Sequence, residues 1–150
     1  MKVIISPDSF KGTMSSVDAA ETIEKGLKQL NETIETVCLP VADGGEGTLE
    51  ALVAATNGKF IELTVCDPIG RKIQARYGVL GDGKTCVIEM AQASGITLLS
   101  EDERNPLQAT TYGTGQLIDH ALGQGYRHFI VGIGGSATND AGLGMLHALG

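Results

Sequence analysis

The amino-acid sequence predicts an α/β fold in which a parallel-sheet lobe is followed by a mixed α/β lobe with an antiparallel hairpin. Three observations support this. An apolar run, a helical pattern and a second extended run follow one another over residues 3–39. Glycine-rich loops separate strand-like from helix-like segments at 40–48 and 132–144. Over residues 72–90, apolar and polar residues alternate around a Gly-Asp-Gly turn, which is typical of a β-hairpin.

Composition and charge indicate a globular domain without affinity for nucleic acid or membranes. The chain has 150 residues, of which 42% are hydrophobic, 19% are charged and 21 residues are glycine. Its formal net charge of −7 argues against nucleic acid or an anionic membrane as a partner. The first apolar run is too short for a signal peptide, and no run approaches the length of a membrane span. The three cysteines lack metal-ligand spacing, so we expect reduced thiols in a cytoplasmic protein.

The amino-terminal segment predicts a β-α-β unit. Residues 3–5 are continuously apolar, as in a strand that is buried on both faces. Ser15 or Ser16 can cap a helix whose apolar residues recur at helical spacing between Ala20 and Leu30. A second strand follows over residues 33–39. Two such strands joined by a helix pair in parallel, with a right-handed crossover.

The loop over residues 40–48 has two interpretations that the sequence leaves open. Asp43 and Glu46 are three residues apart just before a helix, so they can form a capping pair. Loops at the carboxyl ends of parallel strands are also where open α/β sheets bind ligands. In that arrangement the loop over residues 6–13 projects from the same edge. The side chains that would then gather are Asp8, Lys11, Asp43 and Glu46.

A second lobe is predicted to begin near residue 67, which divides the chain into lobes over 1–66 and 67–150. A third strand over residues 59–65 precedes a turn at Asp67-Pro68-Ile69-Gly70. The hairpin comes after this turn. The strand over 59–65 is therefore expected to end the first lobe.

Two charged residues near the hairpin are candidates for function. Arg71, at its base, can meet a carboxylate, although a solvated arginine is the commoner outcome. Glu89 has apolar neighbours on both sides, which suits either a paired structural carboxylate or a site residue. Further along, residues 101–106 are polar and acidic and are expected to form an exposed connection. Thr114 is expected either to cap the helix that follows or to contact phosphate.

The stretch over residues 132–144 has the pattern of an anion-binding loop. It follows an apolar strand at 128–131 and leads into a helical segment at 145–149. Glycines permit close backbone approach, and a helix start favours negative charge. Its polar side chains are Ser136, Thr138, Asn139 and Asp140. A tight turn with a side-chain cap is the alternative interpretation.

Several of these stretches together resemble the type I glycerate kinase family, which phosphorylates D-glycerate with ATP. The resemblance rests on residues 7–12, 42–48 and 132–144, and also on 67–71 and 109–115. It implies a two-lobed α/β kinase, with a flavodoxin-like lobe, a mixed α/β lobe and an active site between them. It also implies ATP and Mg²⁺ as cofactors, and it leans toward 2-phosphoglycerate as the product. A homo-oligomer is compatible with this expectation.

The resemblance and the chemistry of phosphoryl transfer name the candidate site residues. The catalytic candidates are Asp43, Asp140 and Lys11, with Asp43 favoured as the base. The substrate-binding candidates are Asp8, Ser9, Lys11, Arg71 and Asn139. The phosphate- or nucleotide-binding candidates are Gly44, Gly45, Gly134, Gly135, Ser136 and Thr138. The Mg²⁺-binding candidates are Asp43, Glu46 and Asp140.

The chain departs from the family in length, because family members are more than twice as long. We therefore expect it to be the amino-terminal portion, without the remainder of the family domain and with little activity alone. Two other functions stay open. Residues 132–137 fit the G-x-G-x-x-A pattern of an NAD-binding oxidoreductase, although they follow a late strand. A non-catalytic nucleotide- or anion-binding module is the other.

Overall fold

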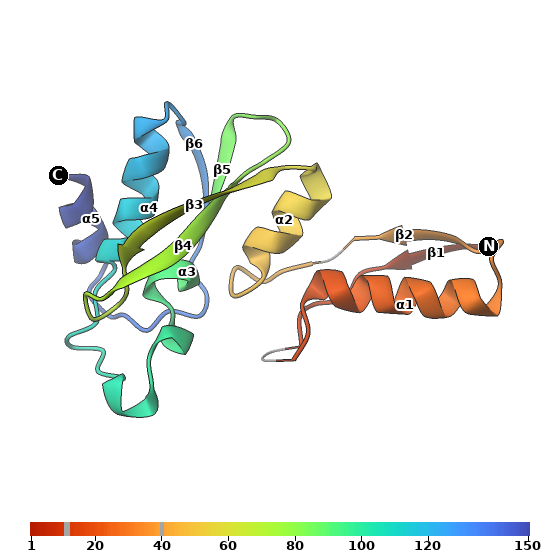
Figure 1. The fold of residues 1–150 in the computed structure, drawn as a ribbon, viewed down its shortest axis with the longest axis horizontal. Helices are drawn as coiled ribbons and strands as arrows, with labels where there is room; N and C mark the ends of the chain where they lie inside the picture. Colours follow the sequence, from red (N-terminus) through yellow and green to blue (C-terminus); the bar gives the residue numbers. More distant parts are fainter. Residues whose placement is uncertain (11–12, 40) are drawn as a thin grey trace.

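A computed structural model describes residues 1–10, 13–39 and 41–150, which form two sheets with helices packed on them (Figure 1). The first sheet has two parallel strands in the order β1-β2, and the second has four strands in the order β3-β4-β5-β6. The predicted α/β class, with a parallel sheet followed by a mixed sheet, is confirmed. No helix in the described part of the chain is both long and apolar enough to cross a membrane.

The amino-terminal β-α-β unit forms as the sequence predicts. Strand β1 (Lys2–Ile5) pairs in parallel with β2 (Glu35–Cys38), and helix α1 (Ser16–Leu30) connects them. Ser15 caps α1, since its Oγ accepts a hydrogen bond from the Asp18 amide at 3.0 Å. In Figure 1 this unit, in red and orange, stands apart from the four-stranded sheet.

The second sheet begins one strand earlier than the sequence suggested. Strand β3 (Lys59–Cys66) pairs antiparallel with β4 (Lys72–Val79) over eight residue pairs. The expected boundary after residue 66 falls between these two strands, which pair with each other. The physical reason is the short turn between the strands, because a short loop costs little entropy to close. The division into two lobes stays a prediction.

The remaining strands complete a mixed sheet. Strand β4 is antiparallel to β5 (Thr85–Glu89), as the hairpin pattern predicts, and β5 is parallel to β6 (His128–Gly132). In this pairing Glu89 lies opposite Gly132, so the end of β5 adjoins the start of the second glycine-rich loop.

The two faces of this sheet are covered differently. Helix α4 (Tyr112–Gly123) packs on one face with the larger apolar core. Its buried members include Val65, Ala75, Tyr77, Val79, Cys86, Ile88, Leu117 and Ala121. Helix α2 (Thr48–Thr56) packs on the other face, where its Leu49 and Val53 form a buried cluster with Val87 of β5. A Cβ on Gly78 would lie 2.8 Å from Leu49 Cδ1, so glycine in β4 lets α2 approach the sheet closely.

Short helices fill the connections. Helix α3 (Ala91–Ser94), the 3₁₀ turns η1 (Ile96–Leu98) and η2 (Glu101–Glu103), and α5 (Leu143–Leu149) complete the element order. The exposed connection expected at 101–106 includes η2. Thr114 does not cap α4, because the N-cap is Thr111. Thr114 is instead buried inside the helix, where its hydroxyl bonds the Ser94 hydroxyl at 2.7 Å.

Candidate functional site

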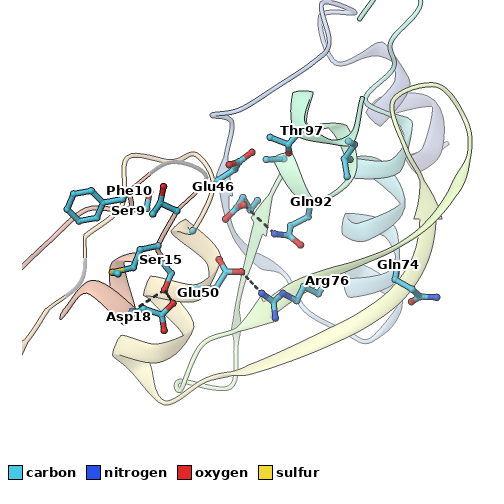
Figure 2. A pocket seen from close by; sticks show the side chains of 16 residues that line it. Ser9, Phe10, Ser15, Asp18, Glu46, Glu50, Gln74, Arg76, Gln92 and Thr97 are labelled. Atoms are coloured by element: carbon cyan, nitrogen blue, oxygen red, sulfur yellow. Dashed lines mark hydrogen bonds and ion pairs between the residues drawn. The ribbon is translucent and has the colours of Figure 1, made fainter. Parts of the chain in front are cut away.

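A cleft of about 630 Å³ lies between the β1-α1-β2 unit and the α2 side of the four-stranded sheet (Figure 2). The loop after β1 contributes Ser9, and the loop before α2 contributes Glu46. Strand β4 contributes Arg76, and Glu89 comes from the end of β5. These segments are far apart in the sequence. The cleft therefore joins loops at the carboxyl ends of β1, β2 and β5, where ligands commonly bind in α/β folds.

The two amino-terminal loops meet at this cleft only in part as predicted. Ser9 and Glu46 line it, whereas Asp8 and Asp43 are exposed and outside its lining. Asp8 accepts a hydrogen bond from the Ser9 amide at 2.7 Å. Lys11, expected in both catalysis and substrate binding, lies outside the described residues.

Asp43 does not act as a helix cap. Helix α2 begins after Gly47, which is its N-cap and has no side chain to offer. Asp43 Oδ1 instead accepts a hydrogen bond from the Gly45 amide at 2.9 Å, a short turn within the loop. Of the two interpretations of Asp43 and Glu46, the capping pair is therefore wrong.

The two glycine-rich loops pack directly against each other. The Gly134 amide donates to the Gly44 carbonyl at 2.8 Å. A Cβ on Gly134 would lie 2.5 Å from Gly45 Cα, and one on Gly132 would lie 2.7 Å from the Gly44 oxygen. Real Cβ atoms do not approach backbone so closely, so both positions require glycine. The glycines permit close contact between two loops of the protein itself.

This contact changes how the phosphate-binding candidates are interpreted. The amide of Gly134 is engaged by Gly44, and the amide of Gly45 by Asp43. The Gly44 amide likewise donates to Thr48 Oγ1 at 3.1 Å. An amide that already donates within the protein is a poor donor to phosphate, so this geometry does not favour the expected cradle at these three glycines.

The hydroxyl groups of the second loop are also engaged internally. Ser136 Oγ accepts from the Thr138 amide at 3.0 Å and lies 2.8 Å from Thr138 Oγ1. The Gly135 carbonyl accepts from the Ile96 amide at 2.9 Å, which ties this loop to η1. Roles for Gly135, Ser136 and Thr138 in nucleotide binding stay a prediction.

Asp140 is held by backbone and hydroxyl donors. Its Oδ2 accepts from the amide and the hydroxyl of Thr111, both at 2.8 Å, and from the Gly144 amide at 3.0 Å. Its Oδ1 accepts from the Gly142 amide at 3.1 Å. Burial alone would raise the pKa of this carboxyl, but these hydrogen bonds outweigh burial and lower it. Asp140 thus links the starts of α4 and α5, which weighs against it as a base or metal ligand.

Asn139 faces a different cavity. A second hollow of about 360 Å³ is lined by Asn139 and Asp140 together with apolar residues such as Val131, Ile133 and Met145. The expectation that Asn139 shares one site with Ser9 is therefore not met by this arrangement.

Arg71 also has a structural role. Its Nε donates to Asp67 at 2.5 Å, its Nη1 to Glu103 at 2.7 Å and its Nη2 to the Leu98 carbonyl at 3.1 Å. These bonds tie the turn after β3 to the two 3₁₀ turns. A guanidinium engaged through all three nitrogens is not disposed to bind a substrate carboxylate.

The Mg²⁺ candidates do not gather. Within residues 1–10, 13–39 and 41–150, no group of three or more His, Cys, Asp or Glu side chains is placed to hold a metal ion. Glu46 lines the cleft, Asp43 lies outside its lining and Asp140 is engaged elsewhere. The expected set of three carboxylates is therefore not a metal site in this arrangement.

Several residues of the cleft, among them Glu50, Arg76 and Gln92, were missed by sequence reasoning. Arg76 donates to Glu50, as the dashed line in Figure 2 shows, and its guanidinium lies 4.3 Å from the centre of the Phe60 ring. Gln92 lines the cleft beside them. Alternation along β4 signalled that Arg76 faces away from the α4 core, but the sequence does not reveal that a cleft lies on that side.

The cleft suits a small hydroxyl-bearing ligand. Its lining combines the Ser9 and Ser15 hydroxyls with the carboxylates of Asp18, Glu46 and Glu50. Carboxylates accept hydrogen bonds from alcohol groups, and hydroxyls both donate and accept. Arg76 is a cation among these groups, already paired with Glu50.

Comparison with known proteins gives consistent matches along the chain. A model of the glycerate kinase family matches residues 3–150. A glycerate kinase of Bacillus subtilis (strain 168) is 56% identical over 150 residues, which is 100% of this chain and 39% of the relative. A glycerate 2-kinase of Escherichia coli (strain K12) is 51% identical over 150 residues, again 100% of this chain and 39% of the relative.

A solved structure agrees with these matches. The crystal structure of a proposed glycerate kinase 2 from Salmonella typhimurium LT2 superposes with a TM-score of 0.87 at 48% sequence identity. The match includes 100% of this chain and 40% of the Salmonella chain. The chain thus spans about two fifths of the length of the relatives it matches.

Proposed function

Because this chain belongs to the glycerate kinase family, we propose that a protein of full family length that carries it transfers a phosphoryl group from ATP to D-glycerate. The family match over residues 3–150 is the observation that carries the proposal. The cleft between the amino-terminal unit and the four-stranded sheet is the proposed acceptor site, since its carboxylates and the Ser9 hydroxyl can hydrogen-bond to the alcohol groups of glycerate, with Arg76 as the cation of the lining. The oxidoreductase alternative is set aside because of family membership.

Asp43 is the proposed general base. Phosphoryl transfer asks the protein mainly to position the acceptor and to stabilise charge. Asp43 is exposed, three residues before Glu46 of the cleft, and its Oδ1 is oriented by the Gly45 amide. In the proposed step it accepts the proton of the acceptor hydroxyl as the oxygen attacks the terminal phosphorus of ATP, and the bond from that phosphorus to its bridging oxygen breaks to release ADP. Family resemblance favours the 2-hydroxyl as that acceptor.

No step is assigned to a metal ion. The three carboxylates expected to bind Mg²⁺ are dispersed, and the described residues hold no cluster that fits one. Nucleotide contacts are likewise not assigned to Gly44, Gly45 or Gly134, whose amides donate within the protein. The same proposal has the protein act in the cytoplasm, with ATP as the phosphoryl donor.

ATP turnover of the full-length protein tests this function. We expect ATP consumption that depends on D-glycerate, with glycerol as the control that lacks a carboxylate. Phosphorus NMR of the product identifies the modified hydroxyl, and 2-phosphoglycerate is the expected result. Equal turnover with glycerol would remove the case for an acid substrate. No turnover with D-glycerate would leave a non-catalytic binding module as the better description.

A further inference from the structure

Glu89 is a buried carboxyl group at the end of β5, on the face of the sheet that α2 covers. Side chains two residues apart on a strand share a face, and Val87 belongs to the α2 cluster. Glu89 is only 1% exposed, yet it is among the residues at the edge of the cleft. Because buried polar groups are costly unless they are hydrogen-bonded, its partners indicate its role.

The main partner of Glu89 is the first turn of α2. Its Oε2 accepts a hydrogen bond from the Leu49 amide at 2.9 Å. The first amides of a helix have no partner within the helix, and a capping side chain usually supplies one. Gly47, the N-cap of α2, has no such side chain, and Leu49 is fully buried, away from water. Glu89 therefore acts as the missing cap, although it lies 40 residues away.

The other carboxyl oxygen is weakly engaged. Oε1 lies 3.4 Å from Gln92 Nε2, a long hydrogen bond. Burial raises the pKa of Glu89 above its ordinary value, and the nearby charges of Glu50 and Glu46 add to this. A neutral glutamic acid can still accept from the Leu49 amide, so the cap does not require the charge.

This cap holds one end of the loop over residues 43–47, and the second glycine-rich loop holds the other. The loop runs directly into α2, whose start is bound to β5 through Glu89. Near its beginning, the Gly44 carbonyl accepts from Gly134 at 2.8 Å. Asp43 and Glu46 therefore belong to a short segment that is fixed to its neighbours at two points.

We propose that Glu89 is a positioning residue that caps α2 from the neighbouring strand and so fixes the loop that carries Asp43 and Glu46, of which Glu46 lines the cleft. The effect of Glu89 on turnover rests on the proposed function, whereas its role as the cap of α2 does not. Because only 1% of Glu89 is exposed where it lines the cleft, the proposal has it act through the loop and not through contact with a substrate.

Two substitutions in the full-length protein separate positioning from direct catalysis. Glu89→Leu keeps a similar volume but removes the acceptor for the Leu49 amide. A small displacement of a catalytic group costs up to about 100-fold in rate, so we expect kcat for D-glycerate to fall about 10- to 100-fold. Glu89→Gln retains a carbonyl oxygen for the same amide, and we expect its kcat to stay within about threefold of wild type by the same argument.

Hydrogen exchange at the Leu49 amide gives a readout that does not depend on turnover. We expect faster exchange in Glu89→Leu and near-normal protection in Glu89→Gln. Tyr77→Phe is the matched control, since Tyr77 is also fully buried in this sheet but bonds His120 on the α4 side. It is expected to lower the thermal midpoint without changing kcat or Leu49 exchange. If Glu89→Leu does not fold, Glu89→Ala replaces it.

Two outcomes would overturn the proposal. A Glu89→Gln variant as inactive as Glu89→Leu would mean that the carboxylate itself is needed in the reaction. Wild-type protection of Leu49 in both Glu89→Leu and Glu89→Ala would show that no cap was lost. If the wild-type protein lacks turnover with D-glycerate, the proposed function fails, and the exchange measurement still decides whether Glu89 caps α2.

Discussion

The two glycine-rich loops of this protein have similar sequences but use their aspartates differently. Asp43 directly precedes Gly44, Asp140 lies two residues before Gly142, and both aspartates stand between a strand and a helix. Asp140 receives four hydrogen bonds of 3.1 Å or shorter, from Thr111, Gly142 and Gly144. Asp43 is exposed and bonds the nearby Gly45 amide. The comparison teaches that the supply of local donors, more than the motif, separates a carboxylate engaged by the fold from one that is left exposed.

The largest effect is expected from Asp43→Asn in the full-length protein. A general base contributes about 10²–10⁴-fold to rate, so turnover with D-glycerate should fall by about that factor. The amide oxygen of asparagine can still accept from Gly45, so the thermal midpoint should stay near that of wild type. Steady-state kinetics and thermal unfolding measure the two quantities. Near-normal turnover would erase the functional contrast between the two aspartates.

Asp140→Ala should lower the stability of the fold more than it lowers the turnover of the folded protein. Each buried donor left without a partner costs about 1–3 kcal/mol, and Asp140 serves several. We expect a lower urea midpoint, with the remaining folded protein turning over far better than Asp43→Asn. Asp119→Ala, at an exposed position of α4, is the control and should change little. A stable but inactive Asp140→Ala would transfer the base role to Asp140.

Gly134→Ala tests the contact between the two loops. The added Cβ would lie 2.5 Å from Gly45 Cα, and overpacking of this kind typically costs about 1–3 kcal/mol. Gly26→Ala in α1 is the matched control, because a Cβ there meets nothing within 4 Å and alanine favours a helix. Chemical denaturation should therefore show opposite signs for the two variants. Equal stability of both would mean that the loops are not packed as described.

The smallest effect is a dependence of stability on pH. The pKa of Asp140 is lowered from its ordinary value of 3.8, so the folded state binds fewer protons there than the unfolded state. The stability that ionised Asp140 gives the folded state is present above pH 3.8, the pKa of the unfolded chain. It is lost as the pH falls through the lower pKa of the folded state. Urea midpoints between pH 6 and pH 2 measure it. Asp140→Asn should flatten this curve, and the difference from wild type cancels contributions of other acids, such as Asp67.

Local patterns determined most of the secondary structure. The spacing of apolar residues between Ala20 and Leu30 indicated α1, and Ser15, one of its two expected caps, does cap it. The alternation over residues 72–90 produced the β4-β5 hairpin. Such features can be read from sequence because each depends on neighbours a few residues away. The combination of loop motifs was likewise sufficient to identify the glycerate kinase family from sequence.

Only the tertiary structure decided which groups meet. Strand β3 pairs with β4 instead of joining the parallel sheet, which no pattern within residues 59–65 specifies. Asp140 finds its donor Thr111 29 residues earlier in the chain, and Glu89 finds Leu49 at a separation of 40. Arg71 is occupied by groups up to 32 residues away. A residue's type fixes which bonds it can make, but packing between distant segments decides whether those bonds are filled, and this separates structural from available side chains.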